Sequence, residues 1–431
     1  MRLRLALLLI GAAPAALAQS SPWYVGSSLS ITHDSNLLRL GQPESAPAGA
    51  SQSDIITSIA LVGGLDQPIG RQRLTGSFSL RDNRFSRNDR YNNQSYNVGS
   101  ALQWSSVYRL SGSLSAGLSR NLSTFNSDVQ GVLGERNYET TKAANASISV
   151  GVVTEWSLEA GLGARRLSNS LDQPITRSRD FWQDDGSLGI AWRPSDLLGV
   201  TLSQREVQGT FPRFSIDASG GQTQDRFTQR TTELAVRWQA SGASALELRV
   251  AGNNTGYETN ASRDFDGVGG SLSWAWQPTG RLRLISSLGR DDGRDNYPTT
   301  IIARVTCRPQ LFPGQVCFGQ VPITITDRRT VGTARVQADW QASAKIALST
   351  SLQSNRRAVD RERFFLDGTV VALPESGTDT TTIFTLGGRW GPQRWSQLGC
   401  DLRHETRSAS GTVTTDLRGT SFNCYAQFTL Q

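Results

Sequence analysis

The chain has two histidines, the residues most often used as general acids or bases near neutral pH, and a carboxylate follows each of them. His33 precedes Asp34, and His404 precedes Glu405. If the chain closes into a barrel, these dipeptides would flank the final strand, where an Asp-His or Ser-His pair could serve a hydrolase acting at the outer leaflet. Isolated histidines at a rim are far more often ordinary polar residues. We therefore predict that the protein is not an enzyme and has no catalytic residue.

Four cysteines, Cys307, Cys317, Cys400 and Cys424, are the remaining candidates for metal or disulfide chemistry. No Cys-x-x-Cys spacing occurs, and an even cysteine count in an exported protein favours disulfides over metal. Cys307 and Cys317 flank the segment PQLFPGQ, so we predict a loop disulfide between them. Cys400 and Cys424 are equally distant from a turn centred on position 412, and an antiparallel hairpin there would place them opposite each other at bonding distance. We predict this second disulfide and no metal or other cofactor.

Alternation with a period of two dominates the sequence. In TGRLRLISSLG, Leu282, Leu284 and Leu288 share one parity, whereas Arg281 and Arg283 have the other. Successive side chains of a strand point to opposite faces, so this pattern predicts strands with one apolar face. The runs last about ten to fourteen residues, longer than the usual ~5–6, and a strand that crosses a bilayer needs ~9–11. We expect strands that span a membrane.

A tryptophan followed by turn-forming residues recurs at several strand ends, as in WRPSD, WQASG, WQPTG and WQASA. In an outer-membrane barrel, every second connection is a short periplasmic turn, and aromatic rings lie at the membrane interface. We therefore interpret each such corner as a periplasmic hairpin. The predicted interface aromatics are Trp23, Trp104, Trp192, Trp238, Trp276, Trp340 and Trp390.

Together with a turn near DQPIG (66–70) and one before Trp156, these corners give eight turns. With both chain ends in the periplasm, they predict an all-β fold: a single antiparallel up-and-down barrel of about 18 strands, 16 being possible. The first strand should run from Trp23 to about His33, and the last from about Thr420 to Leu430. A β-propeller also repeats a tryptophan motif, but the irregular intervals here fit two long strands and an unequal loop each. The longest predicted outer loop spans residues 292–326, either as a constriction of the lumen or as a braced surface loop.

Arginines accumulate on the parity that should face the lumen, where acids are fewer. The predicted lumen-facing basic residues are Arg73, Arg81, Arg109, Arg165, Arg193, Arg205, Arg237, Arg249, Arg281, Arg283, Arg335 and Arg403. The inward acids are Glu159, Glu233, Glu247, Asp339 and Asp401. Such a wall would favour anionic solutes, or its arginines would pair with the acids and brace the barrel. Because the arginines are spread by parity and do not form one patch, nucleic-acid binding is not expected.

The first eighteen residues differ from the rest of the chain. A short basic start, MRLR, precedes an apolar run and the small-residue site ALA before Gln19. This pattern is typical of a signal peptide, so we predict that residues 1–18 are removed and that residues 19–431 form the barrel. Together with the strand pattern, it predicts location in the bacterial outer membrane, with membrane lipid as a partner.

The segment SPWYVGSSLSITHDSNLLRL, the repeated Trp corners, the Cys400/Cys424 pair and the ending CYAQFTL resemble exopolysaccharide-operon outer-membrane barrels of the EpsL type. These are exosortase-associated members of a β-barrel porin group. The ending is also similar to the closing strand recognised by the outer-membrane assembly machinery, although Gln431 replaces the usual terminal aromatic residue. The resemblance implies a channel that takes part in export or biosynthesis of an extracellular polysaccharide. A general diffusion porin for small anionic solutes and a non-conducting structural barrel are the alternatives, and the sequence leaves the oligomeric state open.

Overall fold

The structure, a computed structural model, describes the chain in ten segments. These are residues 21–42, 44–107, 109–123, 135–151, 155–216, 221–259, 264–305, 317–365, 374–411 and 413–430. The predicted signal peptide, residues 1–18, lies outside the described residues.

The described residues form eighteen strands in one antiparallel sheet. The strands are β1 (Trp23–Asp34), β2 (Asp54–Ile69), β3 (Gln72–Phe85), β4 (Asn93–Ser105), β5 (Leu110–Leu122), β6 (Tyr138–Val150), β7 (Trp156–Asn169), β8 (Phe181–Ser195), β9 (Leu198–Ile216), β10 (Gln222–Ser241), β11 (Ser244–Tyr257), β12 (Phe265–Thr279), β13 (Leu282–Val305), β14 (Cys317–Gln341), β15 (Ile346–Phe365), β16 (Glu375–Gln393), β17 (Ser396–Gly411) and β18 (Leu417–Leu430). The described helical segments are η1 (Asp89–Tyr91) and α1 (Pro174–Arg177). No described helix is long and apolar enough to cross a membrane.

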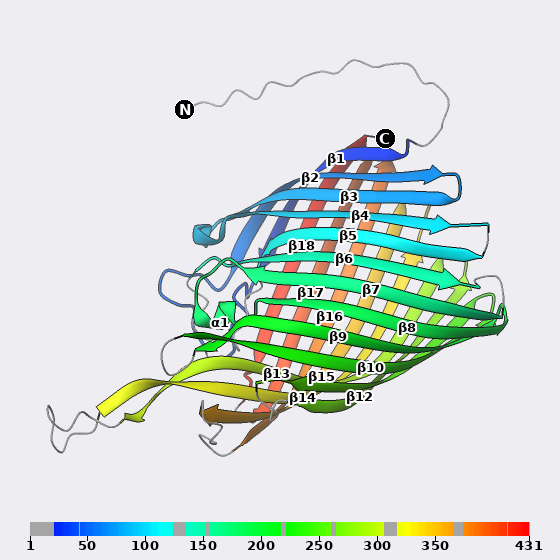
Figure 1. Cartoon of the computed structure of the whole chain (residues 1–431). Coiled ribbons are helices and arrows are strands. Elements are labelled where there is room, and N and C mark those ends of the chain that lie inside the picture. Colours follow the sequence, from blue (N-terminus) through cyan, green and yellow to red (C-terminus); the bar gives the residue numbers. More distant parts are fainter. Residues whose placement is uncertain are drawn as a thin grey trace, which may run out of the picture.

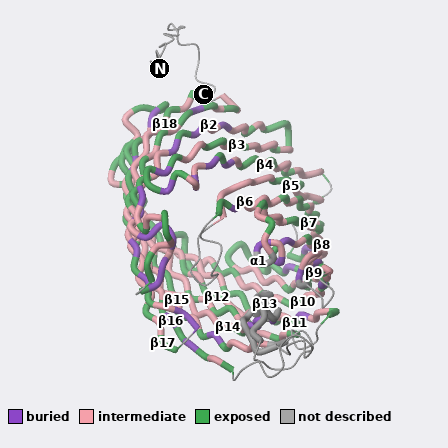
Figure 2. Tube along the Cα trace, turned by 90° about the vertical axis from the view of Figure 1, so that its left-hand side faces the viewer, coloured by how far each residue is buried: buried purple, intermediate pink, exposed green. Residues whose placement is uncertain are grey.

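Each strand pairs with its neighbours in the chain, and β1 also pairs with β18, which closes the sheet into a barrel. Figure 1 shows the strands running between two ends: short turns at one end, where β1 begins and β18 ends, and longer connections at the other. Viewed from the end with the long connections, the strands form a ring (Figure 2). The predicted fold is confirmed, including the 18 strands, and β1 and β18 match their expected limits to within three residues.

The register fixes which side chains face outward. On β10, Trp238 is opposite Leu198 and Leu246, and these three share a face with Leu234 and Val236. Large apolar side chains on this face are exposed, which is the expected exterior of a barrel in a bilayer. The opposite parity carries Glu233, Arg237 and the small polar residues of the interior. Period-two patterning, and not a buried apolar core, therefore determines how this chain folds.

The segment predicted as the longest outer loop spans residues 292–326, and its described residues, 292–305 and 317–326, are strand. β13 and β14 continue pairing from Leu282 opposite Trp340 as far as Val305 opposite Cys317. The resulting hairpin extends beyond the rest of the barrel (Figure 1). β13 also contacts α1 and β9. The polar, proline-containing sequence of this segment suggested a loop, but pairing along the hairpin satisfies its backbone groups, and Ile323 and Ile325 of β14 are buried. The predicted Cys307–Cys317 bond lies outside the described residues, since Cys307 does, and it stays a prediction.

The outer connections contain a small apolar core. Leu37, Leu38 and Leu40, from the connection after β1, pack against Phe85 at the end of β3 and Tyr91 of η1. Burial raises the pKa of the Tyr91 phenol. These leucines belong to the segment HDSNLLRL, which also carries part of the resemblance to the EpsL-type barrels. The segment therefore has a structural role, because it joins two outer connections at the rim.

Polar contacts hold the same segment in a tight turn. The Asn36 side chain donates to the Leu40 carbonyl at 2.9 Å and accepts from the Leu40 N–H at 2.9 Å. Arg39 has a φ of 52°, a left-handed conformation that is uncommon for a residue with a side chain. Its guanidinium pairs with Asp34 at 3.1 Å and donates to the Asn36 carbonyl at 2.7 Å, which compensates for that conformation.

Candidate functional site: the barrel lumen

The inner wall is polar and built largely from small side chains. Along β5, the inward residues include Ser111, Ser113 and Ser115, and the Ser113 hydroxyl bonds to that of Ser147 on β6 at 2.8 Å. A hollow of about 900 Å³ lies against the wall between β4 and β11. Its lining includes Gln103, Ser147, Glu159, Arg205, Gln229, Glu233 and Arg249. Small polar residues leave space and offer hydroxyl and amide groups, as an aqueous channel requires.

All twelve predicted lumen-facing arginines are described, and five of them form ion pairs within the described chain. The pairs are Arg73–Asp66, Arg193–Glu159, Arg205–Asp185, Arg249 with Glu233 and Glu247, and Arg403–Glu405. Bracing of the wall thus accounts for part of the set. Arg335 donates to the Gln337 amide oxygen at 2.8 Å.

Two of the predicted wall arginines do not belong to strands. Arg109 and Arg281 lie in the turns before β5 and β13, at the end with the short turns. The alternation of each following strand extends back onto its turn residue, which is why sequence parity placed both arginines on the wall. Arg281 nevertheless lines a hollow of about 570 Å³ together with Arg283 and Arg389. Arg389, which precedes the outward Trp390, was absent from the predicted set.

Four aromatic side chains form a continuous arc at the outer end of the inner wall. The ring centroids of Phe181 and Phe211 are 5.9 Å apart, those of Phe211 and Phe227 are 5.7 Å apart, and those of Phe227 and Tyr257 are 5.8 Å apart. The four rings come from the adjacent strands β8, β9, β10 and β11 and are half-buried. The guanidinium of Arg165 lies 5.5 Å from the Phe181 ring centroid.

The arc was missed at the sequence level, although a signal was present. Each of the four residues has the same odd parity as the inward Arg205 and Glu233. Aromatic residues on the polar parity of four successive strands should have suggested a lining feature. Their height in the lumen depends on the stagger between strands, which the alternation does not provide.

Glycines let aromatic rings lie along the wall. Gly209 is directly opposite Phe227 in the register, and a Cβ at Gly209 would overlap the Phe227 ring. At the other end of the lumen, Tyr24 covers Gly64 and Tyr425 covers Gly399 in the same way. A ring that lies over a glycine is parallel to the wall and turns its face toward the lumen.

The connection between β7 and β8 reaches inward over the arc. Figure 2 shows α1 within the ring of strands, and α1 contacts β7, β9 and β13, which are not all neighbours. The buried carboxylate of Asp180, which follows α1, pairs with Arg213 of β9 and accepts from the Asn169 N–H at 2.7 Å. This connection is therefore fastened to the strands that carry the arc.

The predicted interface tryptophans lie close to the short turns. Trp192, Trp238, Trp276, Trp340 and Trp390 face outward and are between 38% and 50% exposed. Trp23 is outward at the start of β1, and Trp104 is outward opposite Gly112 of β5. Trp182 lies at the opposite end, at the start of β8.

The cysteines that the structure describes in full form the predicted pair. Cys400 and Cys424 are directly opposite in the register of β17 and β18 and are joined by a disulfide. The two histidines face outward on either side of β18 and are not brought together. His33 is opposite Phe422, whereas His404 bonds through Nδ1 to the Thr420 hydroxyl at 2.8 Å.

The described chain is a closed antiparallel barrel of eighteen long strands, with an apolar exterior, a polar interior and short turns at one end. These features define a β-barrel protein of the bacterial outer membrane. No protein-family model matches the chain, and no curated protein matches its sequence significantly.

Solved outer-membrane proteins show a distant likeness to the chain. The ferric enterobactin receptor PfeA of Pseudomonas aeruginosa is 10% identical with a TM-score of 0.44, covering 94% of this chain and 80% of that one. The apoprotein of the FrpB iron transporter of Neisseria meningitidis is 7% identical with a TM-score of 0.49, covering 95% and 81%. The siderophore receptor PirA of Acinetobacter baumannii is 8% identical with a TM-score of 0.40, covering 94% and 80%. At this level the likeness supports no inference about fold or ligand, and the assignment to outer-membrane barrels rests on strand pairing and side-chain parity.

Proposed function

We propose that the protein is an outer-membrane channel for a glycan, namely an extracellular polysaccharide or a segment of one. The arc of Phe181, Phe211, Phe227 and Tyr257 on an otherwise polar wall carries this proposal. A small anionic solute gains nothing from a row of four aromatic rings, because the ring faces are electronegative. A sugar chain does, because it alternates apolar C–H faces with hydroxyl groups.

The chemistry of each part of the wall fits such a chain. The face of an aromatic ring is electronegative and attracts the slightly positive C–H groups of a pyranose face. Serine, asparagine and threonine side chains along the lumen can exchange hydrogen bonds with sugar hydroxyls as the chain moves. Each contact is individually weak, and weak contacts at several sites suit transport, since tight binding would stop the chain.

The resemblance to EpsL-type barrels gives the same direction to the proposal, because it implies a role in extracellular polysaccharide export or biosynthesis. A second candidate, a general diffusion porin for small anionic solutes, is favoured by Arg237, Arg281 and Arg283, which form no ion pair within the described residues. The two candidates differ in what the aromatic arc should do.

Single-channel recording in a planar bilayer tests the proposal. Soluble oligosaccharides added on the outer side should interrupt the ion current, and the triple variant Phe211→Ala, Phe227→Ala, Tyr257→Ala should lose roughly tenfold or more in apparent affinity. The control is Trp182→Ala. It removes an aromatic ring at the outer end of β8, the end at which the arc lies, but on the outward face. It should leave the interruptions unchanged.

Other outcomes decide between the alternatives. Anion-selective current that no oligosaccharide interrupts would support the diffusion porin and contradict the glycan channel. A folded barrel that carries no current would support the non-conducting structural barrel.

A further inference from the structure

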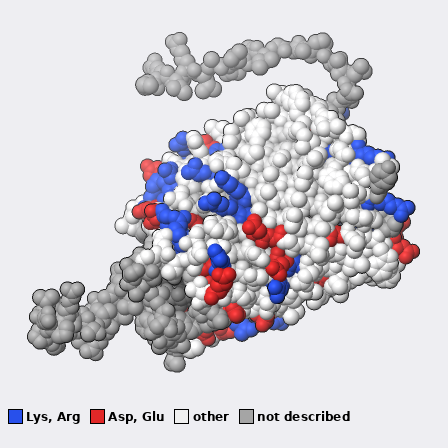
Figure 3. All heavy atoms as spheres, in the orientation of Figure 1, with Lys and Arg blue, Asp and Glu red and all other residues white. Residues whose placement is uncertain are grey.

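The outward face of β5, β6 and β7 carries three basic residues at its outer end. Arg120 on β5, Lys142 on β6 and Arg166 on β7 all have outward parity. Figure 3 shows Lys and Arg gathered at this end of the face and a broad band with little charge toward the short turns. We call these three residues the outer basic cluster.

The height of the outer basic cluster follows from the register. Gly112 is opposite Trp104 at the short-turn end, and Arg120 lies eight residues further along β5. Eight residues at ~3.3 Å each, tilted by ~40°, rise roughly 20 Å, close to the ~25 Å height of the apolar band of such barrels. The cluster therefore lies where the headgroups of the outer leaflet begin.

The charges of this cluster are not compensated within the described chain. Lys142 is directly opposite Arg166 in the register, and like charges in facing positions destabilise a strand pair. No described acid forms an ion pair with any of the three, although Asp184 of β8 lies diagonal to Arg166. Arg120 instead lies over the Tyr138 ring, 4.1 Å from its centroid. Such an arrangement is stabilised when an anion lies between the cations.

Directly below the outer basic cluster, the outward surface is hollowed. Ala144 and Ala164 are the next outward residues from Lys142 and Arg166, and both line a hollow of about 470 Å³. It shares Leu114, Ala146 and Leu162 with a second hollow of about 800 Å³ that reaches Leu188.

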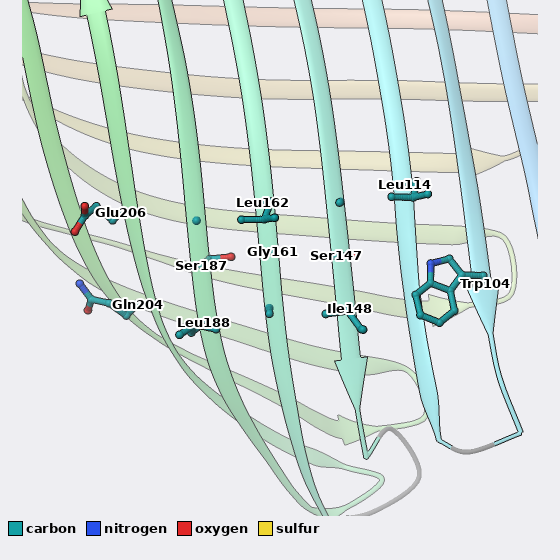
Figure 4. A pocket seen from close by; sticks show the side chains of 13 residues that line it. Trp104, Leu114, Ser147, Ile148, Gly161, Leu162, Ser187, Leu188, Gln204 and Glu206 are labelled. Atoms are coloured by element: carbon teal, nitrogen blue, oxygen red, sulfur yellow. The ribbon is translucent and has the colours of Figure 1, made fainter.

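Figure 4 shows Leu114 of β5, Leu162 of β7 and Leu188 of β8 around this second hollow. Small residues such as Ala144, Ala164 and Gly186 create the depression, and the larger aliphatic side chains form its walls. The two hollows together form an apolar groove on the face that meets lipid.

We propose that this face binds a phosphorylated glycolipid of the outer leaflet, of the lipid A class. Its phosphate groups would contact Arg120, Lys142 and Arg166, and its acyl chains would lie in the apolar groove below. The outer basic cluster and the apolar groove adjoin on the same three strands. The phosphates and the acyl chains of one lipid molecule can therefore contact both at once. The site is on the exterior, so the proposal is independent of what the lumen conducts.

Native mass spectrometry of the full chain in detergent, titrated with diphosphoryl lipid A, tests this. The variant Arg120→Gln, Lys142→Gln, Arg166→Gln should weaken retention of the lipid roughly 100-fold, at about fivefold for each basic residue. The control Arg290→Gln, Arg356→Gln, Arg418→Gln removes three outward arginines, one each from β13, β15 and β18. It should retain the lipid like the unmodified protein.

Two further arms separate charge from shape. Ala144→Leu with Ala164→Leu fills the groove while keeping the cluster, and it should also weaken retention. Lipid A from which phosphatase has removed the phosphates should bind the unmodified protein weakly. Its affinity should equal that of intact lipid A for the variant without the outer basic cluster. Equal retention by the cluster and control variants, equal retention of the phosphate-free lipid, or displacement of the lipid by millimolar inorganic phosphate would each overturn the proposal. Circular dichroism confirms that every variant remains a folded barrel.

Discussion

Cys400 of β17 and Cys424 of β18 lie directly opposite each other, with Cα atoms 4.1 Å apart and a disulfide between their sulfurs. The bond ties the last strand to its neighbour next to the seam where β18 meets β1. It closes a loop of ~25 residues, which in the chain-entropy picture stabilises the barrel by about 3.5 kcal/mol through the unfolded state.

The double variant Cys400→Ala, Cys424→Ala should therefore unfold at a lower urea concentration, with a free energy of unfolding lower by roughly 2–4 kcal/mol. Unfolding in detergent micelles, followed by tryptophan fluorescence, measures the difference. The unmodified protein treated with a reductant serves as the control and should resemble the variant. Identical unfolding of the oxidised protein and the variant would contradict the stabilising role of the bond.

The unpaired arginines near the short turns should make the channel prefer anions. Replacing Arg237, Arg281 and Arg283 with Gln should lower the ratio of anion to cation permeability, measured as the reversal potential in a salt gradient. The effect should be at most about fivefold per charge, because two charges 4 Å apart in water interact by only about 1 kcal/mol. Replacement of the same three arginines with Lys is the control, since Lys keeps each positive charge and should leave the ratio unchanged. Cation preference in the unmodified protein would contradict this prediction.

The barrel was predictable because each strand has water on one side and lipid on the other. Polar and apolar residues therefore alternate along the sequence with a period of two. The Trp corners and the DQPIG turn placed the eight short turns, and equal distances from one turn were enough to pair Cys400 with Cys424. The outer end follows other rules. Residues 292–305 look like a loop by composition, yet they pair with β14 in a hairpin that extends beyond the barrel and has no bilayer to impose a pattern.

The site was harder to predict than the fold. Parity identified which arginines point inward, but it could not show that Arg205 forms an ion pair with Asp185, whereas Arg237, although opposite Glu247 in the register, forms none within the described residues. The aromatic arc likewise depends on the stagger of β8 to β11, because residues distant in sequence reach one height only when strand shear is known. Apart from pairs that are equally distant from one turn, such as Cys400 and Cys424, contacts across strands cannot be located from the periods along them.

Because the Phe227 ring lies over Gly209, adding a single methyl group at position 209 should change the binding of sugars to the aromatic arc. In Gly209→Ala, the new Cβ would overlap the Phe227 ring, so the ring must turn away from the wall. Loss of one stacking contact should weaken interruption of the current by oligosaccharides by roughly threefold to tenfold. Gly252→Ala on β11 is the matched control, because nothing lies within 4 Å of a Cβ there. Equal interruption in both variants would show that the orientation of Phe227 does not matter for sugar binding.

The small apolar core at the outer rim should behave as a unit separate from the barrel. Leu38 is 0% exposed and packs with Phe85 and Tyr91, so Leu38→Ala should cost about 2–5 kcal/mol of local stability. Because the core belongs to the outer connections, the loss should open residues 35–53 to proteases without lowering the urea midpoint of the barrel. A loss of 2 kcal/mol corresponds to cleavage roughly 30-fold faster when opening precedes cutting. The control is Leu80→Ala, which shortens an outward leucine of β3 that is 48% exposed. Two results would show that the rim core is not an independent unit. One is unchanged cleavage of residues 35–53 in Leu38→Ala. The other is a fall in the free energy of unfolding of the barrel as large as the local loss.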